Sequence, residues 1–261
     1  MQIKGYKVVV TASSAASLEG LAGAAVRRLV REGARVTLIS PDGPGGKAVC
    51  QSAGRKARSR VARPKGFGRA VASAAKAMGG LDALVNIVQP DTPWQPFAEK
   101  GPAGFQPAFD ALGGAVAAMQ AAWPHLSALD DRGRVVNVGS VYGGSSYAGV
   151  SDSVASDYAL QGITRSAGVE WAPTGVRVNY LGPGALDVPE FRRWRERYPA
   201  MVDHRVDSLA ARRLGTLDED FGGALMFLLC DEACFLVGQT VYADGGQHLV
   251  APVLEPGVPL G

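Results

Sequence analysis

Three polar side chains near the middle of the chain are of types that could take part in proton transfer. Ser140 follows an apolar run, while Ser153 and Asp157 lie four residues apart and therefore share one face of a helix. A carboxylate beside a hydroxyl raises the pKa of that hydroxyl, so Asp157 would not activate Ser153. Ser151 and Ser153 suit helix N-caps, and an aspartate near a helix start interacts favourably with the helix dipole. We therefore expect Ser153 and Asp157 to be structural, and Ser140 to be a polar residue at a strand end.

Metal binding and disulfide bonding are not expected. The histidines stand in unrelated segments without metal-ligand spacing: His125, His204 and His248. Three cysteines are too few and too irregularly spaced for a disulfide framework or a metal knuckle. Two of them, Cys230 and Cys234, fall near the end of an apolar helix, where we expect small core residues.

The elements that must position these groups alternate along the chain. Short apolar runs predict strands over 7–11, 35–39, 58–62, 81–86, 134–138, 176–180 and 239–242. Longer alanine-rich segments predict helices over 18–31, 67–78, 105–123, 153–171 and 217–230, the third ended by Pro124. Strands that are apolar on both faces and separated by helices indicate a doubly wound parallel sheet in an α/β domain.

One domain is expected over residues 1–247, because no linker or internal repeat interrupts this alternation. The segment 187–213 departs from it, since it is charged and carries five arginines between Arg192 and Arg205. We expect this segment over the carboxyl ends of the strands, where doubly wound sheets bind ligands. The proline-rich tail 248–261 is expected to be frayed or to lie at a subunit interface.

Composition excludes several classes of protein. The 261 residues are 47% hydrophobic and 20% charged with a net charge of +3, which argues against disorder and a disulfide scaffold. No apolar run is long enough to span a membrane, and no signal peptide is evident, so we expect a cytoplasmic protein.

Eight basic and no acidic residues lie between Lys47 and Arg69. They form either a solvated face or a contact with phosphates or an acidic partner. Nucleic acid is not expected, because only Phe67 interleaves with these charges.

Motifs in the second half of the chain have the order and spacing of a known family. They are Gly133-Arg-Val-Val-Asn-Val-Gly-Ser140, Gly162-Ile-Thr-Arg-Ser166, Val176-Arg-Val-Asn179, Pro183-Gly184 and Ala243-Asp-Gly-Gly246. On these motifs the chain resembles the short-chain dehydrogenase/reductase family over essentially its whole length. The resemblance implies a single doubly wound Rossmann-like domain, with a seven-stranded parallel sheet in the order 3-2-1-4-5-6-7 and helices on both faces.

Family members bind a nicotinamide dinucleotide at a Thr-Gly-x-x-x-Gly-x-Gly turn, where missing side chains let the backbone approach the pyrophosphate. Here Ala12, Ala16 and Leu18 stand at the glycine positions, while Gly20 and Gly23 are expected inside the following helix. Four more contact positions depart from the family pattern, at Ser40, Arg60, the segment that begins at Asn86, and Val188. These departures imply that no dinucleotide binds, and no cofactor is expected.

The family's reaction uses a tyrosine, a lysine one helical turn later, a serine and an asparagine. Ser140 matches the serine, whereas Ser153, Asp157 and Ala111 stand at the tyrosine, lysine and asparagine positions. Three other tyrosines have no suitably placed lysine in the sequence: Tyr142, Tyr147 and Tyr158. We therefore expect no catalytic residues.

These departures predict a catalytically inactive subunit that supports an active NAD-dependent short-chain alcohol dehydrogenase, in the manner of hetero-oligomeric members such as hydroxybenzylsuccinyl-CoA dehydrogenase. The chain would assemble with that homologous subunit, or with itself, through helices 105–123 and 153–171 and segment 217–242. The alternatives are a non-redox enzyme resembling halohydrin dehalogenases, a ligand-sensing binding protein, and a dehydrogenase with an unusual site.

Overall fold

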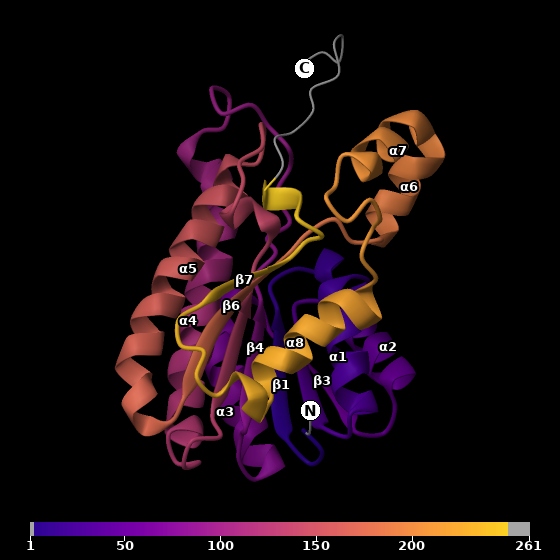
Figure 1. Ribbon diagram of the computed structural model, residues 1–261. Coiled ribbons are helices and arrows are strands. Elements are labelled where there is room, and N and C mark those ends of the chain that lie inside the picture. The colour runs from indigo at the N-terminus through magenta and orange to yellow at the C-terminus, as the bar shows by residue number, and fades with distance from the viewer. Residues whose placement is uncertain (1–2, 250–261) are drawn as a thin grey trace.

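Seven parallel strands form one sheet at the centre of the molecule (Figure 1). The computed structural model describes residues 3–249, apart from the side chain of Glu190. The strands are β1 (Lys7–Ala12), β2 (Arg35–Ser40), β3 (Ala57–Val61), β4 (Ala83–Ile87), β5 (Arg134–Val138), β6 (Arg177–Pro183) and β7 (Thr240–Ala243). Their order is β3-β2-β1-β4-β5-β6-β7, which confirms the predicted fold class.

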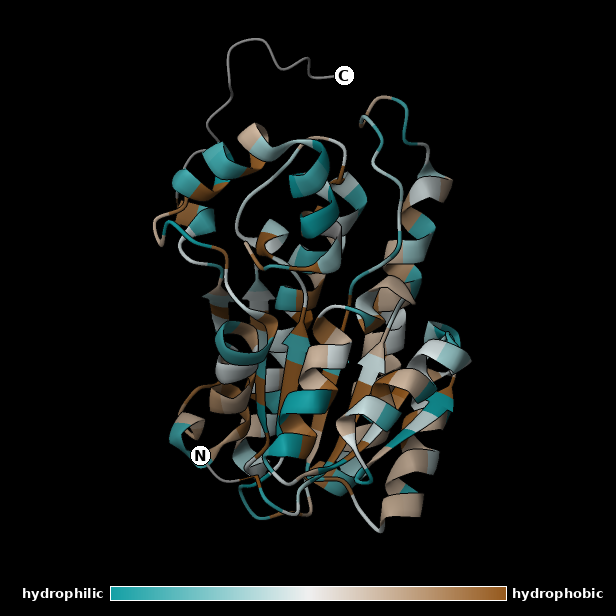
Figure 2. Ribbon diagram, turned by 90° about the vertical axis from the view of Figure 1, so that its right-hand side faces the viewer, coloured by the Kyte–Doolittle hydropathy of each residue, from teal (hydrophilic) through white to brown (hydrophobic). Residues whose placement is uncertain are grey.

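Helices cover both faces of the sheet. They are α1 (Leu21–Arg31), α2 (Gly43–Ala53), α3 (Phe67–Met78), α4 (Gln106–Leu126), α5 (Ser151–Trp171), α6 (Pro189–Arg197), α7 (Pro199–Asp207) and α8 (Gly222–Leu229). One apolar core joins α1, α2 and α8 to the sheet, and a second joins α3, α4 and α5 to its other face. Figure 2 shows the apolar strands enclosed between helices whose outer surfaces are more polar. Association through α4 and α5 stays a prediction.

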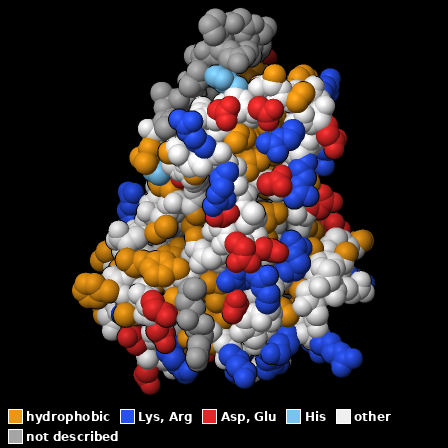
Figure 3. Space-filling model, turned by 45° about the vertical axis from the view of Figure 1, so that its right-hand side comes forward, with side chains coloured by type: hydrophobic (Ala, Val, Ile, Leu, Met, Phe, Trp, Pro, Cys, Tyr) orange, Lys and Arg blue, Asp and Glu red, His pale blue; other side chains and the backbone are white. Residues whose placement is uncertain are grey.

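The charged segment 187–213 lies over the carboxyl ends of the strands, as expected from its composition. It forms α6 and α7, which stand above the sheet at the upper right of Figure 1. Figure 3 shows acidic and basic side chains mixed on this side of the molecule. The surface ion pairs within this segment include Arg192–Asp187 and Arg195–Asp203.

Several sequence-based boundaries were wrong. Helix α4 continues past Pro124 to Leu126: the proline removes one backbone hydrogen bond, that to residue 120, and the helix ends two residues later. Helix α2 was not predicted, since its first residues are Gly-Pro-Gly-Gly. It begins there because the Asp42 side chain caps it, accepting a hydrogen bond from the Gly45 amide. The segment 217–230 divides into a π-turn at Leu217–Phe221 and α8. Of the two cysteines expected in the core, Cys230 is buried but Cys234 is exposed.

A chain of buried polar side chains fixes the register beneath the site. Thr11 Oγ1 donates to Asn86 Oδ1 at 2.8 Å, and Asn86 Nδ2 donates to Asn137 Oδ1 at 2.9 Å. Asn137 Nδ2 then donates to Thr164 Oγ1 on α5 at 2.9 Å. A shift of one residue between β1, β4 and β5 would leave these buried groups unpaired, so the network holds the three strand ends at one level.

Candidate functional site

Two adjoining cavities open at the carboxyl end of the sheet, with volumes of about 380 Å³ and about 420 Å³. We call them the apolar pocket and the polar pocket. The apolar pocket lies below α6 and α7, and the polar pocket runs from the first turn of α1 to α5. Residues that line both are Leu21, Gln89, Ser140, Tyr142, Val150 and Val188. Ser140 thus faces both spaces, at the end of β5.

Ser140 and Asp157 form the most closely connected polar pair at this junction. The Ser140 hydroxyl donates a very short hydrogen bond to Asp157 Oδ2, and the Ser140 amide lies 3.2 Å from Asp157 Oδ1. The Tyr142 amide donates to Ser140 Oγ at 3.1 Å, which leaves the hydroxyl hydrogen directed at the carboxylate. Tyr180 from β6 completes the cluster, since its hydroxyl donates to the Ser140 carbonyl oxygen at 2.9 Å.

Burial sets the protonation of this cluster. Asp157 is only 3% exposed, and burial raises the pKa of its carboxyl to about 7, although hydrogen bonds from Ser140 and Tyr180 act in the opposite direction. Burial and the nearby Asp157 also raise the pKa of Tyr180, so this phenol stays neutral. A carboxylate with a pKa near 7 can both accept and return a proton at neutral pH.

The N-caps expected at Ser151 and Ser153 were wrong, whereas the favourable interaction expected between Asp157 and the helix dipole was not tested. The Asp157 carboxyl accepts hydrogen bonds from the Ser140 hydroxyl and amide, in the turn that follows β5. Neither Ser151 nor Ser153 caps α5, whose N-cap is Val150. Ser153 lines the polar pocket, and Ala111 is buried in α4.

Two glycines let the strand end approach Asp157. A Cβ added to Gly139 would lie 2.2 Å from Asp157 Oδ1, and one added to Gly143 would lie 3.3 Å from Asp157 Cβ. The sequence spacing gave no sign of this contact, because Ser140 and Asp157 are brought together by the packing of α5 against β5 and β6. The only sign of this contact in the sequence was a glycine on either side of Ser140, at positions 139 and 143.

The first turn of α1 differs from the expectation in a way that affects ligand binding. Gly20 is the N-cap of α1 and does not lie inside the helix. The chain reaches it through a short 3₁₀ turn, Ala16–Leu18, so the loop after β1 is longer than the family spacing assumed. The Leu18 side chain is 3% exposed and packs into the core with α1 and α2. It therefore does not project into the polar pocket.

The backbone at this helix start remains open to a ligand. A Cβ on Gly20 would meet only the Ser17 carbonyl oxygen, at 3.9 Å, and both residues line the polar pocket. A glycine is needed at position 23 for close packing, because a Cβ added there would lie 2.2 Å from the Leu18 carbonyl oxygen. The unpaired amides of a helix N-terminus favour anions, and this one faces the polar pocket.

Of the remaining positions compared with the family cofactor contacts, most lie outside the polar pocket. Ser40 is buried and its hydroxyl donates to the Asp42 carbonyl oxygen, while Arg60 donates to Ser73 on α3. Asn86 belongs to the buried polar network, and Ala12 is buried at the end of β1. Ala16 and Val188 do line the polar pocket.

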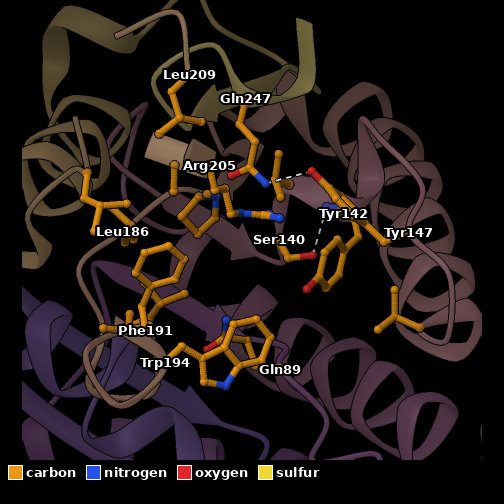
Figure 4. Close-up of a pocket in the computed structure, with 18 of the residues that line it drawn as sticks. Gln89, Ser140, Tyr142, Tyr147, Leu186, Phe191, Trp194, Arg205, Leu209 and Gln247 are labelled. Carbon is orange, nitrogen blue, oxygen red and sulfur yellow. Dashed lines mark hydrogen bonds between the residues drawn. The ribbon is translucent and has the colours of Figure 1, made fainter. Parts of the chain in front are cut away.

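The apolar pocket is walled mainly by side chains from the segment after β6 (Figure 4). Phe191 and Trp194 from α6 lie on the side opposite Tyr142 and Tyr147. Further apolar walls come from Trp94, Val141, Val150, Leu186, Leu209 and Leu214. Its size and lining suit a small, largely hydrocarbon ligand with a few polar groups.

A buried ion pair joins the loops that border both pockets. Lys100 Nζ lies 2.5 Å from Asp152 Oδ1, and the two side chains are 1% and 0% exposed. Lys100 also donates to the Gly149 carbonyl oxygen at 3.3 Å. Burial acts to raise the pKa of Asp152, but hydrogen bonds from Lys100 and Thr92 lower it below its usual value. The pair therefore stays charged and ties the segment after β4 to the start of α5.

Known proteins resemble this chain over nearly its full length. A family model described as "Enoyl-(Acyl carrier protein) reductase" matches residues 15–248. The chain belongs to the short-chain dehydrogenase/reductase family. Over 237 residues it is 31% identical to cis-4-hydroxycyclohexanecarboxylate dehydrogenase of Sinomonas cyclohexanicum, covering 87% of this chain and 92% of the relative.

Two further similarities support this assignment. The chain is 28% identical over 250 residues to 2,5-dichloro-2,5-cyclohexadiene-1,4-diol dehydrogenase of Sphingobium indicum, covering 94% of this chain and 97% of the relative. The crystal structure of levodione reductase has the same fold, with a TM-score of 0.83 at 22% identity, covering 95% of this chain and 99% of that one.

The prediction of an inactive subunit was wrong. Relatives that match most of this short-chain dehydrogenase/reductase are named as dehydrogenases, including the two described above. The same finding argues against a dehalogenase or a ligand sensor. Within residues 3–249, no helix is long and apolar enough to cross a membrane, and no cluster of three or more potential metal ligands occurs.

Proposed function

We propose that this chain interconverts a small cyclic alcohol and its ketone, with Ser140 and Asp157 handling the proton. The observation that carries the proposal is the hydrogen bond from Ser140 to Asp157 at the junction of the two pockets. It is supported by relatives named as dehydrogenases of ring alcohols. Ser153 and Asp157 stand where the family has its tyrosine and lysine, so the proton route would differ from the family's.

The proposed proton route begins at the apolar pocket. A substrate hydroxyl there would donate to Ser140 Oγ, whose own hydrogen is directed at Asp157. In oxidation, with an oxidised nicotinamide dinucleotide as the hydride acceptor, the substrate hydroxyl proton would pass to Ser140 and the Ser140 proton would pass to Asp157. Reduction reverses each transfer. A carboxylate with a pKa near 7 suits both directions, because it loses and gains the proton at little cost at neutral pH.

A nicotinamide dinucleotide supplies the hydride chemistry when bound, and the residues present fit its reactive part. The backbone of Gly20 and Leu21 would hold the diphosphate, because it is open to the polar pocket at a helix N-terminus. The polar pocket extends from there to Ser140 and Asp157, where the nicotinamide would lie. The Ser40 hydroxyl at the end of β2 already donates to the Asp42 carbonyl oxygen, so it gives no basis for choosing between NAD and NADP. Experiments should therefore use both dinucleotides.

Replacing Ser140 by alanine tests the proposed role directly. We expect Ser140→Ala to lower kcat by about 100-fold or more, because it breaks the proton route between substrate and Asp157. Ser145→Ala is the matched control, since Ser145 bonds only to the Val141 carbonyl oxygen in the same turn and lines neither pocket. Steady-state rates with a panel of ring alcohols provide the measurement. Loss of activity in Ser153→Ala with full activity in Ser140→Ala would refute the assignment.

The pKa of Asp157 predicts opposite pH profiles for the two directions. Asp157 must be ionised to accept a proton, so oxidation should slow about tenfold per pH unit below pH 7. Reduction needs the protonated acid and should slow above pH 7. Tyr180 and Tyr242 also interact with Asp157, but both have raised pKa values and stay neutral over this range. Rates in both directions from pH 5 to 9 would show the two breaks. Profiles that are flat across pH 7 would count against Asp157.

A further inference from the structure

The apolar pocket contains a single charged residue. Among its described lining residues, Arg205 alone carries a charge, and no carboxylate accompanies it. The surrounding walls are mainly apolar or aromatic, with Ser140, Gln89 and Gln247 as the uncharged polar groups. A neutral ring alcohol would gain little from a guanidinium in such a cavity, whereas a singly charged anion would gain a charge-assisted hydrogen bond.

Arg205 is held by an aromatic contact that leaves its donors free. It projects from α7, and its guanidinium carbon lies 5.5 Å from the centre of the Tyr147 ring. Among the described side chains, none forms an ion pair with Arg205, and no described group accepts a hydrogen bond from its guanidinium. Stacking over a ring uses the face of the guanidinium and leaves the N–H groups in its plane available for a carboxylate.

The aromatic platform beneath Arg205 is itself fixed. Gln247 Nε2 donates to the Tyr147 hydroxyl at 2.8 Å, and Gln247 is only 6% exposed. Tyr147 also packs edge-on against Tyr142, with ring centres 5.3 Å apart. Gln247 Oε1 is buried without a hydrogen-bond partner among the described residues, so the side chain is held through its amide nitrogen. The position of the Tyr147 ring therefore does not depend on Arg205.

We propose that Arg205 binds a carboxylate on the substrate, so that the substrate is a ring alcohol or ketone that also carries one carboxylate. This inference rests on the proposed function and names its substrate class. In Figure 4, Arg205 and Ser140 lie on one side of the pocket, and Phe191 and Trp194 lie across it. The carboxylate would pair with Arg205, the ring would lie against the aromatic side chains, and the reacting oxygen would meet Ser140. The single positive charge fits a monoanion better than a phosphate ester.

Equilibrium binding tests this inference without requiring turnover. Calorimetry would compare cyclohexanecarboxylate with its neutral isostere cyclohexanecarboxamide, each titrated into the full chain with and without NADH. We expect the wild-type chain to prefer the carboxylate, and Arg205→Met to weaken its binding by about 10- to 100-fold while leaving the amide unchanged. Arg205→Lys should retain part of the preference. Arg197→Met is the matched control, because Arg197 lies over Tyr198 on α6 and lines neither pocket.

Three results would overturn the inference. The wild-type chain could bind carboxylate and amide equally, it could bind neither, or Arg205→Met could retain the full preference for the carboxylate. Circular dichroism would show that the exposed substitution leaves the fold intact. A chain that binds the carboxylate through Arg205 but shows no effect of Ser140→Ala on turnover would retain this inference and lose the proposed proton route, so the two can fail separately.

Discussion

Asp157→Asn should lower kcat by about 10²- to 10⁴-fold in both directions, with little change in KM. The amide has the shape of the carboxyl. Its oxygen can accept the hydrogen bond from the Ser140 amide and its NH2 group can donate to Ser140 Oγ, but it cannot take up a proton. Loss of general acid–base catalysis has this magnitude in other enzymes. A fall in kcat without a change in KM would place the loss in the transition state.

The same substitution separates catalysis from folding. Asp157 is buried without a countercharge among its hydrogen-bond partners, so a neutral amide should leave the melting temperature unchanged or raise it at pH 8. Asp110→Asn is the control, because Asp110 is a half-buried carboxylate paired with Lys65 and lines neither pocket. An Asp157→Asn chain that folds normally and keeps its activity within about threefold of wild type would exclude the proposed base.

Lys100→Met should destabilise the protein by about 3–5 kcal/mol. It leaves Asp152, which is fully buried, without its positive partner, and an unpaired buried charge is costly. The loss should also loosen the contact between the segment after β4 and residues 148–149. Urea denaturation would measure the change as a lower midpoint at a similar m-value.

A double substitution distinguishes the loss of the pair from the loss of packing. Lys100→Met with Asp152→Leu should recover most of the stability, because apolar residues of similar size often replace a buried ion pair without cost. Lys65→Met is the matched control, since Lys65 is 80% exposed in its pair with Asp110 and should change stability by less than about 1 kcal/mol. If the double substitution is as unstable as Lys100→Met, the buried charge is not the cause.

The sheet could be predicted from the sequence because its signals are local. The runs at 134–138 and 67–78 gave β5 and α3 with their observed bounds, and the apolar alternation gave a doubly wound parallel sheet, whereas the strand order came from the family resemblance. Helix α2 was missed because its glycines and proline are typical of a loop. Helix α6 was missed because its many charged residues are also typical of a loop. In both cases a proline near the first turn marked the helix start.

The site was less predictable because its contacts are distant in sequence. The spacing of Ser153 and Asp157 correctly placed both on α5, but it could not show that Asp157 bonds to Ser140 across the gap left by Gly139. Tyr180 was missed because it occupies an interior strand position. Counting glycine positions from Thr11 failed at α1, since an extended loop moves Gly20 to the helix start.

The most direct measurement is the interconversion of ring alcohols and ketones by the purified chain without any partner protein. Monocyclic substrates with and without a carboxylate would be tested with NAD and NADP in both directions, beside Asp157→Asn. The account predicts saturable turnover by the wild-type chain and its near-complete loss in the variant. No conversion of any substrate with either dinucleotide, or equal rates in the two chains, would contradict it.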